Sequence, residues 1–116
     1  MGTARGHAES YFRAWNAGDA ESLNGLFDPQ VLFRGPMGTA NGPAECTAGL
    51  MGMRAGFLEE VVVEKLLEDG DEVVTWFEMR TRLAGVAPFP VVNRMHVGSR
   101  GIDRIRVVFD PRPLLG

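Results

Sequence analysis

Few side chains of this 116-residue chain could act as an acid, a base, a nucleophile or a metal ligand in an enclosed site. Cys46 is the only cysteine, which excludes an internal disulfide and a cysteine-based metal cluster. No histidine or lysine stands beside it in the sequence to activate the thiol, so we interpret Cys46 as a small buried apolar residue. His7 and His96 are the only histidines. We therefore expect no metal site and no cofactor.

The alternation of side chains along three predicted strands identifies polar residues that could contact a ligand. These strands are expected over residues 73–83, 91–97 and 102–109. Side chains alternate between the two faces of a strand, and the apolar face is the buried one because burial of apolar surface drives folding. Thr81 and Asn93 fall on that apolar face, and Asp103 shares its parity at the beginning of the last strand.

The apolar face, together with the helices and strand that precede it, predicts a pocket rich in aromatic rings and methionine sulfur. We expect its lining to comprise Tyr11, Trp15, Phe27, Phe33, Met37, Met53, Phe57, Phe77, Met79, Thr81, Asn93, Met95, Ile105, Val107 and Phe109. Such a lining suits a flat or flexible hydrophobic molecule with one carbonyl or hydroxyl group.

A group that could transfer a proton is harder to find in this pocket. Glu78 and His96 face outward by strand parity, and most other carboxylates lie in turns or on helix surfaces. Asp103 is the best remaining candidate for a base. General acid–base catalysis needs such a group within hydrogen-bond reach of the substrate. Two neutral hydrogen-bond donors alone could polarise a carbonyl group but could not move a proton efficiently.

The elements that must position these residues follow the order α-α-β-α-β-β-β-β. Helices are predicted over residues 4–17, after Asp19, and over 43–55, and a first short strand over 30–35. Residues 37–42 have the composition of a loop, and regular structure is expected to end at 110–113. Helices followed by an antiparallel meander indicate an α+β fold, and the length fits a single domain over 1–116.

Three segments resemble a known group of proteins. The segments Tyr11-Phe-Arg-Ala-Trp-Asn-Ala-Gly-Asp19, Leu26-Phe-Asp-Pro29 and Phe33-Arg-Gly-Pro-Met-Gly38 are similar to the nuclear transport factor 2-like superfamily, which includes ketosteroid isomerases and SnoaL-type polyketide cyclases. The closing segment 102–113 resembles the last strand of its small members. The resemblance covers essentially the whole chain. It implies a cystatin-like cone, in which a curved antiparallel or mixed sheet wraps around three helices and leaves an apolar pocket at the open end.

The same resemblance implies roles for three positions. Tyr11 and Asn93 match the two residues that donate hydrogen bonds to the substrate oxyanion in ketosteroid isomerases. Gly35 stands at the end of the first strand, where those enzymes carry the carboxylate that acts as general base, and it joins the predicted pocket lining. The chain departs from the isomerase pattern at this position, and the departure removes the group that transfers the proton.

The outward-facing residues of the strands form a separate set: Trp76, Arg80, Arg82, Arg94, His96, Arg104 and Arg106. Cross-strand ion pairs with Glu60, Glu64 and Glu78 would make this face a polar surface for a homodimer, and superfamily members usually pair through it. A basic patch for anionic partners is the alternative.

The overall charge and the hydrophobic runs exclude other partners. A net charge of −3 argues against nucleic acid, and no apolar run approaches the length of a membrane span. The start of the chain does not resemble a signal peptide, so we expect a cytoplasmic protein.

Three functions are compatible with this pattern. The first is binding of a small hydrophobic molecule without efficient proton-transfer chemistry. The second is an enzyme of the isomerase or cyclase (lyase) type, acting next to a carbonyl with Tyr11 and Asn93 as oxyanion donors and Asp103 as a candidate base. The third is a dimeric interaction module that acts through the outer face of the sheet.

Overall fold

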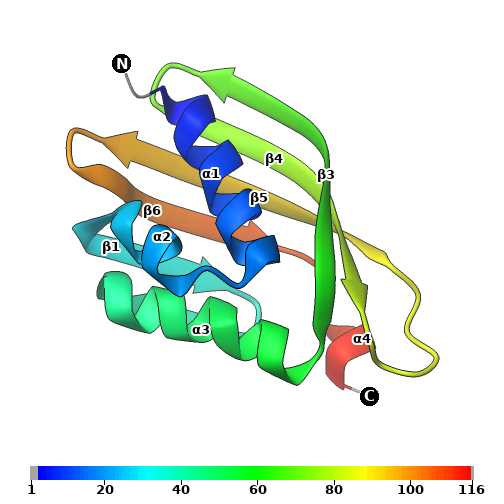
Figure 1. Ribbon diagram of the computed structural model, residues 1–116. Helices are drawn as coiled ribbons and strands as arrows, with labels where there is room; N and C mark the ends of the chain where they lie inside the picture. Colours follow the sequence, from blue (N-terminus) through cyan, green and yellow to red (C-terminus); the bar gives the residue numbers. More distant parts are fainter. Residues whose placement is uncertain (1–2, 116) are drawn as a thin grey trace.

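The first helix is built around aromatic residues at helical spacing. In the computed structural model, which describes residues 3–115, α1 (Ala4–Ala17) buries Tyr11, Phe12 and Trp15. Thr3 caps its first turn by accepting a hydrogen bond from the Gly6 amide at 2.9 Å. Gly18 ends it in the left-handed conformation with φ of 69°. This helix lies across the concave face of the sheet (Figure 1).

Two further helices follow, separated by strands. α2 (Ala20–Gly25) is capped by the Asp19 carboxylate, and α3 (Gly42–Gly56) begins with a proline in its first turn, as predicted. The strands are β1 (Phe27–Gly35), β2 (Gly38–Asn41), β3 (Leu58–Asp69), β4 (Glu72–Thr81), β5 (Phe89–Gly98) and β6 (Gly101–Val108). A short helix, α4 (Arg112–Leu115), follows the last strand.

The six strands form one curved sheet in the order β2-β1-β6-β5-β4-β3. β1 and β6 are parallel, whereas the other neighbouring pairs are antiparallel. α1 and α3 lie on the concave side (Figure 1). Most of the largest buried side chains come from α1 and from the inward faces of β3 to β6, and Leu23 of α2 and Val31 of β1 join them. The predicted α+β class and mixed sheet are confirmed.

α1 is fixed to the edge of the sheet by the side chain of Asn16. Its amide nitrogen donates to the Val61 carbonyl at 2.8 Å, and its amide oxygen accepts from the Val61 amide at 2.7 Å. The side chain thereby takes the place of a neighbouring strand beside β3, which is an edge strand. This contact holds the helix that carries Tyr11 and Trp15 at a fixed distance from the sheet.

Two segments differ from the prediction. Residues 38–41 form a strand rather than a loop, because their backbone pairs with the end of β1, from Leu32 opposite Asn41 to Gly35 opposite Gly38. Their turn-like composition gives no sign of this pairing, which depends on the neighbouring strand. Regular structure also continues past Pro111 into α4. Within residues 3–115, no helix has both the length and the apolar character needed to cross a membrane.

Candidate ligand-binding cavity

An open cavity of about 210 Å³ lies between α1, α3 and the concave face of the sheet. Eleven of the residues predicted to line a pocket do line it. They are Tyr11, Trp15, Phe33, Gly35, Met37, Met53, Phe77, Met79, Asn93, Val107 and Phe109. The strand parity and helix spacing therefore identify most of the residues that line the cavity.

Several predicted lining residues lie elsewhere. Phe27 and Met95 are buried in the core, where the Phe27 ring packs edge-on against Tyr11 with centroids 6.3 Å apart. Ile105 is buried as well and does not line the cavity. Phe57 and Thr81 lie near the junction of α3, β3 and β4. The alternation of side chains correctly predicts which strand residues lie on the concave face of the sheet. The cavity, however, occupies only part of that face.

Seven further residues line the cavity and were not predicted: Pro36, Gly38, Thr39, Ala40, Cys46, Gly49 and Leu50. Those of 36–40 were missed because β2 was interpreted as a loop. Gly49 lies in the interior of α3, where glycine lowers helix stability. A Cβ atom built on Gly49 would meet no heavy atom within 4 Å. A glycine in the interior of a predicted helix could have indicated this part of the cavity, because the missing side chain leaves open space there.

The Asn93 amide is the most unusual polar group of the site. The side chain is 1% exposed, and neither its nitrogen nor its oxygen has a hydrogen-bond partner among the described residues. The hydroxyl of Thr75, directly opposite on β4, is also unpartnered. An unsatisfied buried polar group costs about 1–3 kcal/mol, so a neutral amide left in this state offers both a donor and an acceptor to a ligand.

Tyr11 supplies the second polar group. Burial raises the pKa of its hydroxyl well above the ordinary value, the nearby Cys46 raises it further, and the Asn93 amide partly opposes the shift. Tyr11 and Asn93 are thus close neighbours, although their side chains do not form a hydrogen bond of standard geometry. The phenol stays protonated at neutral pH and can donate its proton in a hydrogen bond.

Cys46 lines the same cavity from α3. Burial, and then the charge of Glu45, raise the pKa of its thiol to about 11. The thiol lies 3.9 Å from the Ala40 carbonyl, to which it donates a weak hydrogen bond. Cys46 is therefore a buried, protonated thiol at neutral pH, as the sequence indicated, and lacks the thiolate that a nucleophile requires.

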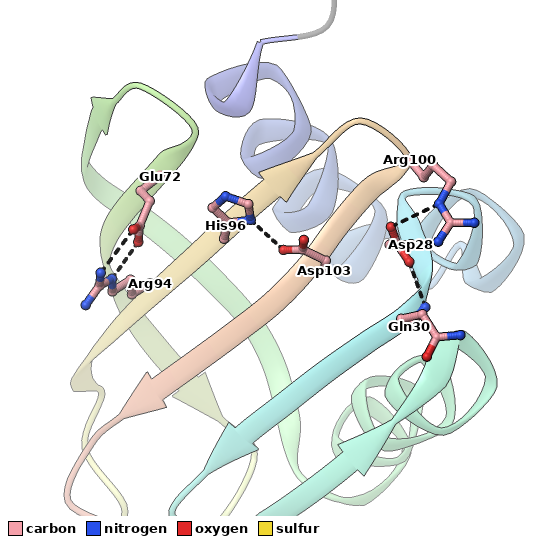
Figure 2. A network of polar contacts seen from close by, with 7 residues as sticks. All are labelled: Asp28, Gln30, Glu72, Arg94, His96, Arg100 and Asp103. Carbon is pink, nitrogen blue, oxygen red and sulfur yellow. Dashed lines mark hydrogen bonds and ion pairs between the residues drawn. The ribbon is translucent and has the colours of Figure 1, made fainter.

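No aspartate, glutamate, histidine, lysine or arginine is among the residues that line this cavity. The placement of Asp103 is a correction to the sequence analysis, because its carboxylate lies on the outer face of the sheet. There it pairs with the His96 ring at 2.6 Å (Figure 2). An irregularity in the pairing of β5 and β6, between His96 and Val97, shifts the register and breaks the simple alternation.

The remaining outward-facing residues divide into two groups. Arg80 pairs with Glu60 and Glu78, as expected, whereas Glu64 accepts from the Trp76 indole. The Arg82 guanidinium instead donates to the Arg54 and Leu58 carbonyls, at the end of α3 and the beginning of β3, which removes it from the predicted dimer face. Cations stabilise the carboxyl ends of helices in this way. The dimer itself stays a prediction.

Among residues 3–115 there is no cluster of three or more histidine, cysteine or acidic side chains that could hold a metal ion. The fold and the site together define a class: a small α+β cone with a predominantly apolar cavity, whose lining contains neutral hydrogen-bonding groups and no charged side chain.

The particular family follows from comparison with known proteins. The model of the SnoaL-like domain matches residues 8–110, and the chain belongs to this family. A comparison with curated proteins gave no match.

Solved structures share the fold at low sequence identity. A nuclear transport factor 2-like protein of unknown function from Cytophaga hutchinsonii superposes with a TM-score of 0.85 at 21% identity, covering 100% of this chain and 97% of that one. An epoxide hydrolase of the LEH-like type from M. tuberculosis gives 0.80 at 19% identity, covering 97% and 86%.

A third structure carries a small molecule. It is a hypothetical protein with a ketosteroid isomerase-like fold from Catenulispora acidiphila, in complex with trimethylamine. It gives a TM-score of 0.78 at 17% identity, covering 90% of this chain and 85% of that one. At these identities the comparison establishes the fold.

Proposed function

We propose that this protein binds a small apolar molecule that carries one carbonyl or hydroxyl group. The size of the cavity limits the ligand. An engineered apolar cavity of about 150 Å³ holds benzene, and the cavity here has about 210 Å³. One or two fused rings match this space, whereas a four-ring molecule would extend well beyond it through the open end.

The observation that carries the proposal is the unpartnered Asn93 amide inside a predominantly apolar cavity. A carbonyl oxygen could accept from the amide nitrogen and from the Tyr11 phenol, and a hydroxyl could use the amide oxygen as well. The aromatic and methionine side chains would cover the hydrocarbon part of the ligand. The polar pair therefore orients the ligand, and the apolar wall supplies most of the affinity.

Catalysis is a second candidate, favoured by one observation. Tyr11 and Asn93 line the same cavity, which supports stabilisation of an enolate oxygen as in an isomerase or cyclase. Proton transfer would have to use water or the substrate itself, because the lining contains no carboxylate or imidazole. Turnover of cyclohexenone-type substrates tests this candidate. Equal and uncatalysed rates in the wild type and in Tyr11→Phe would rule it out.

The binding test uses Trp15 as an internal reporter. Trp15 lines the cavity, whereas Trp76 lies on the outer face and is 46% exposed. In a Trp76→Phe background, the fluorescence of Trp15 reports on the cavity alone. Titration compares 1-tetralone with tetralin, which has the same two rings without the carbonyl group.

We expect 1-tetralone to bind about tenfold more tightly than tetralin, as one to two neutral hydrogen bonds allow. Asn93→Leu replaces the amide with an apolar group of similar size, and we expect it to reduce this preference while tetralin still binds, because the Tyr11 phenol is then the remaining donor. Equal affinities for the two compounds in the wild type, or no binding of either, would contradict the proposal.

A further inference from the structure

The buried side-chain nitrogen and oxygen atoms that lack a hydrogen-bond partner among residues 3–115 all belong to one pair of residues. They are the hydroxyl of Thr75 and both polar atoms of the Asn93 amide. Thr75 is fully buried, and Asn93 is 1% exposed. The two residues stand directly opposite each other on β4 and β5. Such a pair has its Cβ atoms about 4.5–5.5 Å apart, so small side-chain rotations bring the two polar groups within hydrogen-bond distance.

Only one member of this pair lines the cavity. Asn93 is part of the lining and Thr75 is not, so the hydroxyl can act on a ligand only through the amide. The other neighbours of Thr75 along the sheet are apolar. Leu66 is opposite it on β3, and Val73 and Phe77 flank it on the same face of β4. Among these neighbours, the Asn93 amide is the one side chain that can exchange a hydrogen bond with the hydroxyl.

The two ends of the amide are not equivalent, because the nitrogen donates hydrogen bonds and the oxygen accepts them. Burial raises the pKa of Tyr11, and the Asn93 amide opposes this rise, as an N–H group directed at the phenol oxygen does. This places the amide nitrogen on the side of Tyr11 and leaves the amide oxygen for the Thr75 hydroxyl. A hydroxyl that donates to this oxygen holds the amide in that orientation.

We propose that Thr75 is a positioning residue, which turns the Asn93 amide nitrogen toward the ligand and thereby makes the cavity selective for a carbonyl over a hydroxyl group. The amide nitrogen and the Tyr11 phenol then present two donors to one oxygen atom. A carbonyl oxygen accepts from both, whereas a hydroxyl group brings a hydrogen that these two donors leave without an acceptor. The inference rests on the proposed function and narrows its two ligand groups to one.

A pair of matched ligands measures this selectivity. 1-Tetralone and each enantiomer of 1-tetralol have the same two rings and differ only in the oxygen-bearing group. Both are titrated against the fluorescence of Trp15 in the Trp76→Phe background, which is the parent protein for all variants. We expect the parent to bind 1-tetralone more tightly than either enantiomer of 1-tetralol.

Thr75→Val removes the hydroxyl and keeps the branched shape of the side chain. The amide oxygen is then free to turn toward the hydroxyl of 1-tetralol. We expect the ratio of 1-tetralone to 1-tetralol affinity to fall about tenfold, the effect of about one neutral hydrogen bond. The hydration of the free ligands is the same for every variant, so the change in this ratio reports on the protein alone.

Two further variants separate the hydroxyl from its surroundings. Thr75→Ser keeps the hydroxyl without the methyl group and should retain the affinity ratio of the parent. Thr47→Val is the matched control, because Thr47 is a buried threonine outside the cavity lining whose hydroxyl donates to the Asn24 side chain at 3.3 Å. It should also retain the ratio.

Thermal unfolding supplies a readout that a structural role would move in the opposite direction. Thr75→Val deletes a buried hydroxyl that has no partner, so we expect its unfolding midpoint to lie about 4 °C or more above that of the parent. A loss of selectivity in a more stable variant cannot be ascribed to a weakened fold.

Two results would overturn the inference. One is an unchanged affinity ratio in Thr75→Val. The other is an equal fall of the ratio in Thr75→Ser or in Thr47→Val, which would assign the effect to packing instead of the hydroxyl. A failure of the proposed function looks different, because 1-tetralone would then bind no more tightly than tetralin in the parent itself, and the inference would lose its basis.

Discussion

Gly49 offers a direct way to close the cavity without weakening the fold. It lies in the interior of α3 and lines the cavity, and an added Cβ atom would have no neighbour within 4 Å. Gly52 lies on the same helix, has equally open surroundings and does not line the cavity. Gly49→Leu and Gly52→Leu therefore change the same residue type in the same helix, and differ in whether the new side chain enters the cavity.

The expected stabilities of the two variants can be worked out separately. Replacing glycine by leucine in a helix interior contributes about 0.8 kcal/mol through helix propensity alone. Unfolding entropy of about 2.1 cal/mol/K per residue, applied to 116 residues, converts this into a rise of about 3 °C in the unfolding midpoint. We expect Gly52→Leu to gain only this amount.

Gly49→Leu should gain more than Gly52→Leu, because part of its side chain would cover the apolar wall of the cavity, although Gly49 itself is exposed. Complete transfer of the four added carbon atoms from water sets an upper limit of about 3 kcal/mol, from which the loss of rotamer freedom subtracts about 1 kcal/mol. The additional gain is therefore at most about 2 kcal/mol, or roughly 8 °C beyond the propensity effect. The same side chain occupies much of the space in which a ligand would lie.

The assay combines thermal unfolding with titration of 1-tetralone against the fluorescence of Trp15, in the Trp76→Phe background. We expect Gly49→Leu to be the more stable variant and to lose binding, while Gly52→Leu binds like its parent. Unchanged 1-tetralone affinity in Gly49→Leu would refute the assignment of the site. A lower midpoint for Gly49→Leu than for Gly52→Leu would show that the space beside Gly49 is too small for a leucine.

Three further predictions concern the thiol, the missing base and the outer face. With a pKa of about 11 against an ordinary 9.0, Cys46 should react with iodoacetamide about a hundredfold more slowly at pH 8 than after unfolding in denaturant, and faster as the pH rises towards 11. An unaltered rate on folding would contradict its burial. Gly35→Asp should place a carboxylate in the cavity lining, where a Cβ atom is 3.3 Å from the Phe33 ring. We expect a gain of about 10²-fold or more in enone isomerisation, and no gain would argue against enolate stabilisation by Tyr11 and Asn93. The predicted homodimer should dissociate in Trp76→Glu, because Trp76, Val92 and Val108 stand opposite one another as an apolar stripe on the outer face. A wild-type monomer by sedimentation at micromolar concentration would contradict it.

Much of the cavity wall could be predicted because burial follows local periodicity. Phe77 and Met79 alternate with Trp76 and Glu78 along one strand, and Trp15 follows Tyr11 by one helical turn. Such patterns decide which face is buried wherever the backbone is regular. They do not decide how far along that face the cavity extends, which is why Met95 was assigned to it and lies in the core instead.

The residues that were misplaced depend on contacts between distant segments. Asp103 lies on the outer face because the pairing of β5 with β6 is irregular near it, and a single shift in register reverses the side of every following residue. Arg82 leaves the outer face because the carbonyls at the end of α3 are within reach of its guanidinium. Residues 38–41 become a strand only because β1 offers an unpaired edge.

The sequence by itself determined the class of fold and the apolar character of the pocket, since these follow from residue type and spacing, and its resemblance to ketosteroid isomerases implied the loss of a carboxylate at Gly35. Only the tertiary structure decided that the Asn93 amide is buried without a partner, and that Gly49 leaves the cavity open. It likewise brought Arg34 beside Arg106 across parallel strands. The physical reason is the same in each case. Whether a polar group has a partner, whether space stays open and which charges adjoin depend on residues that lie far apart in the chain and meet only in the folded structure.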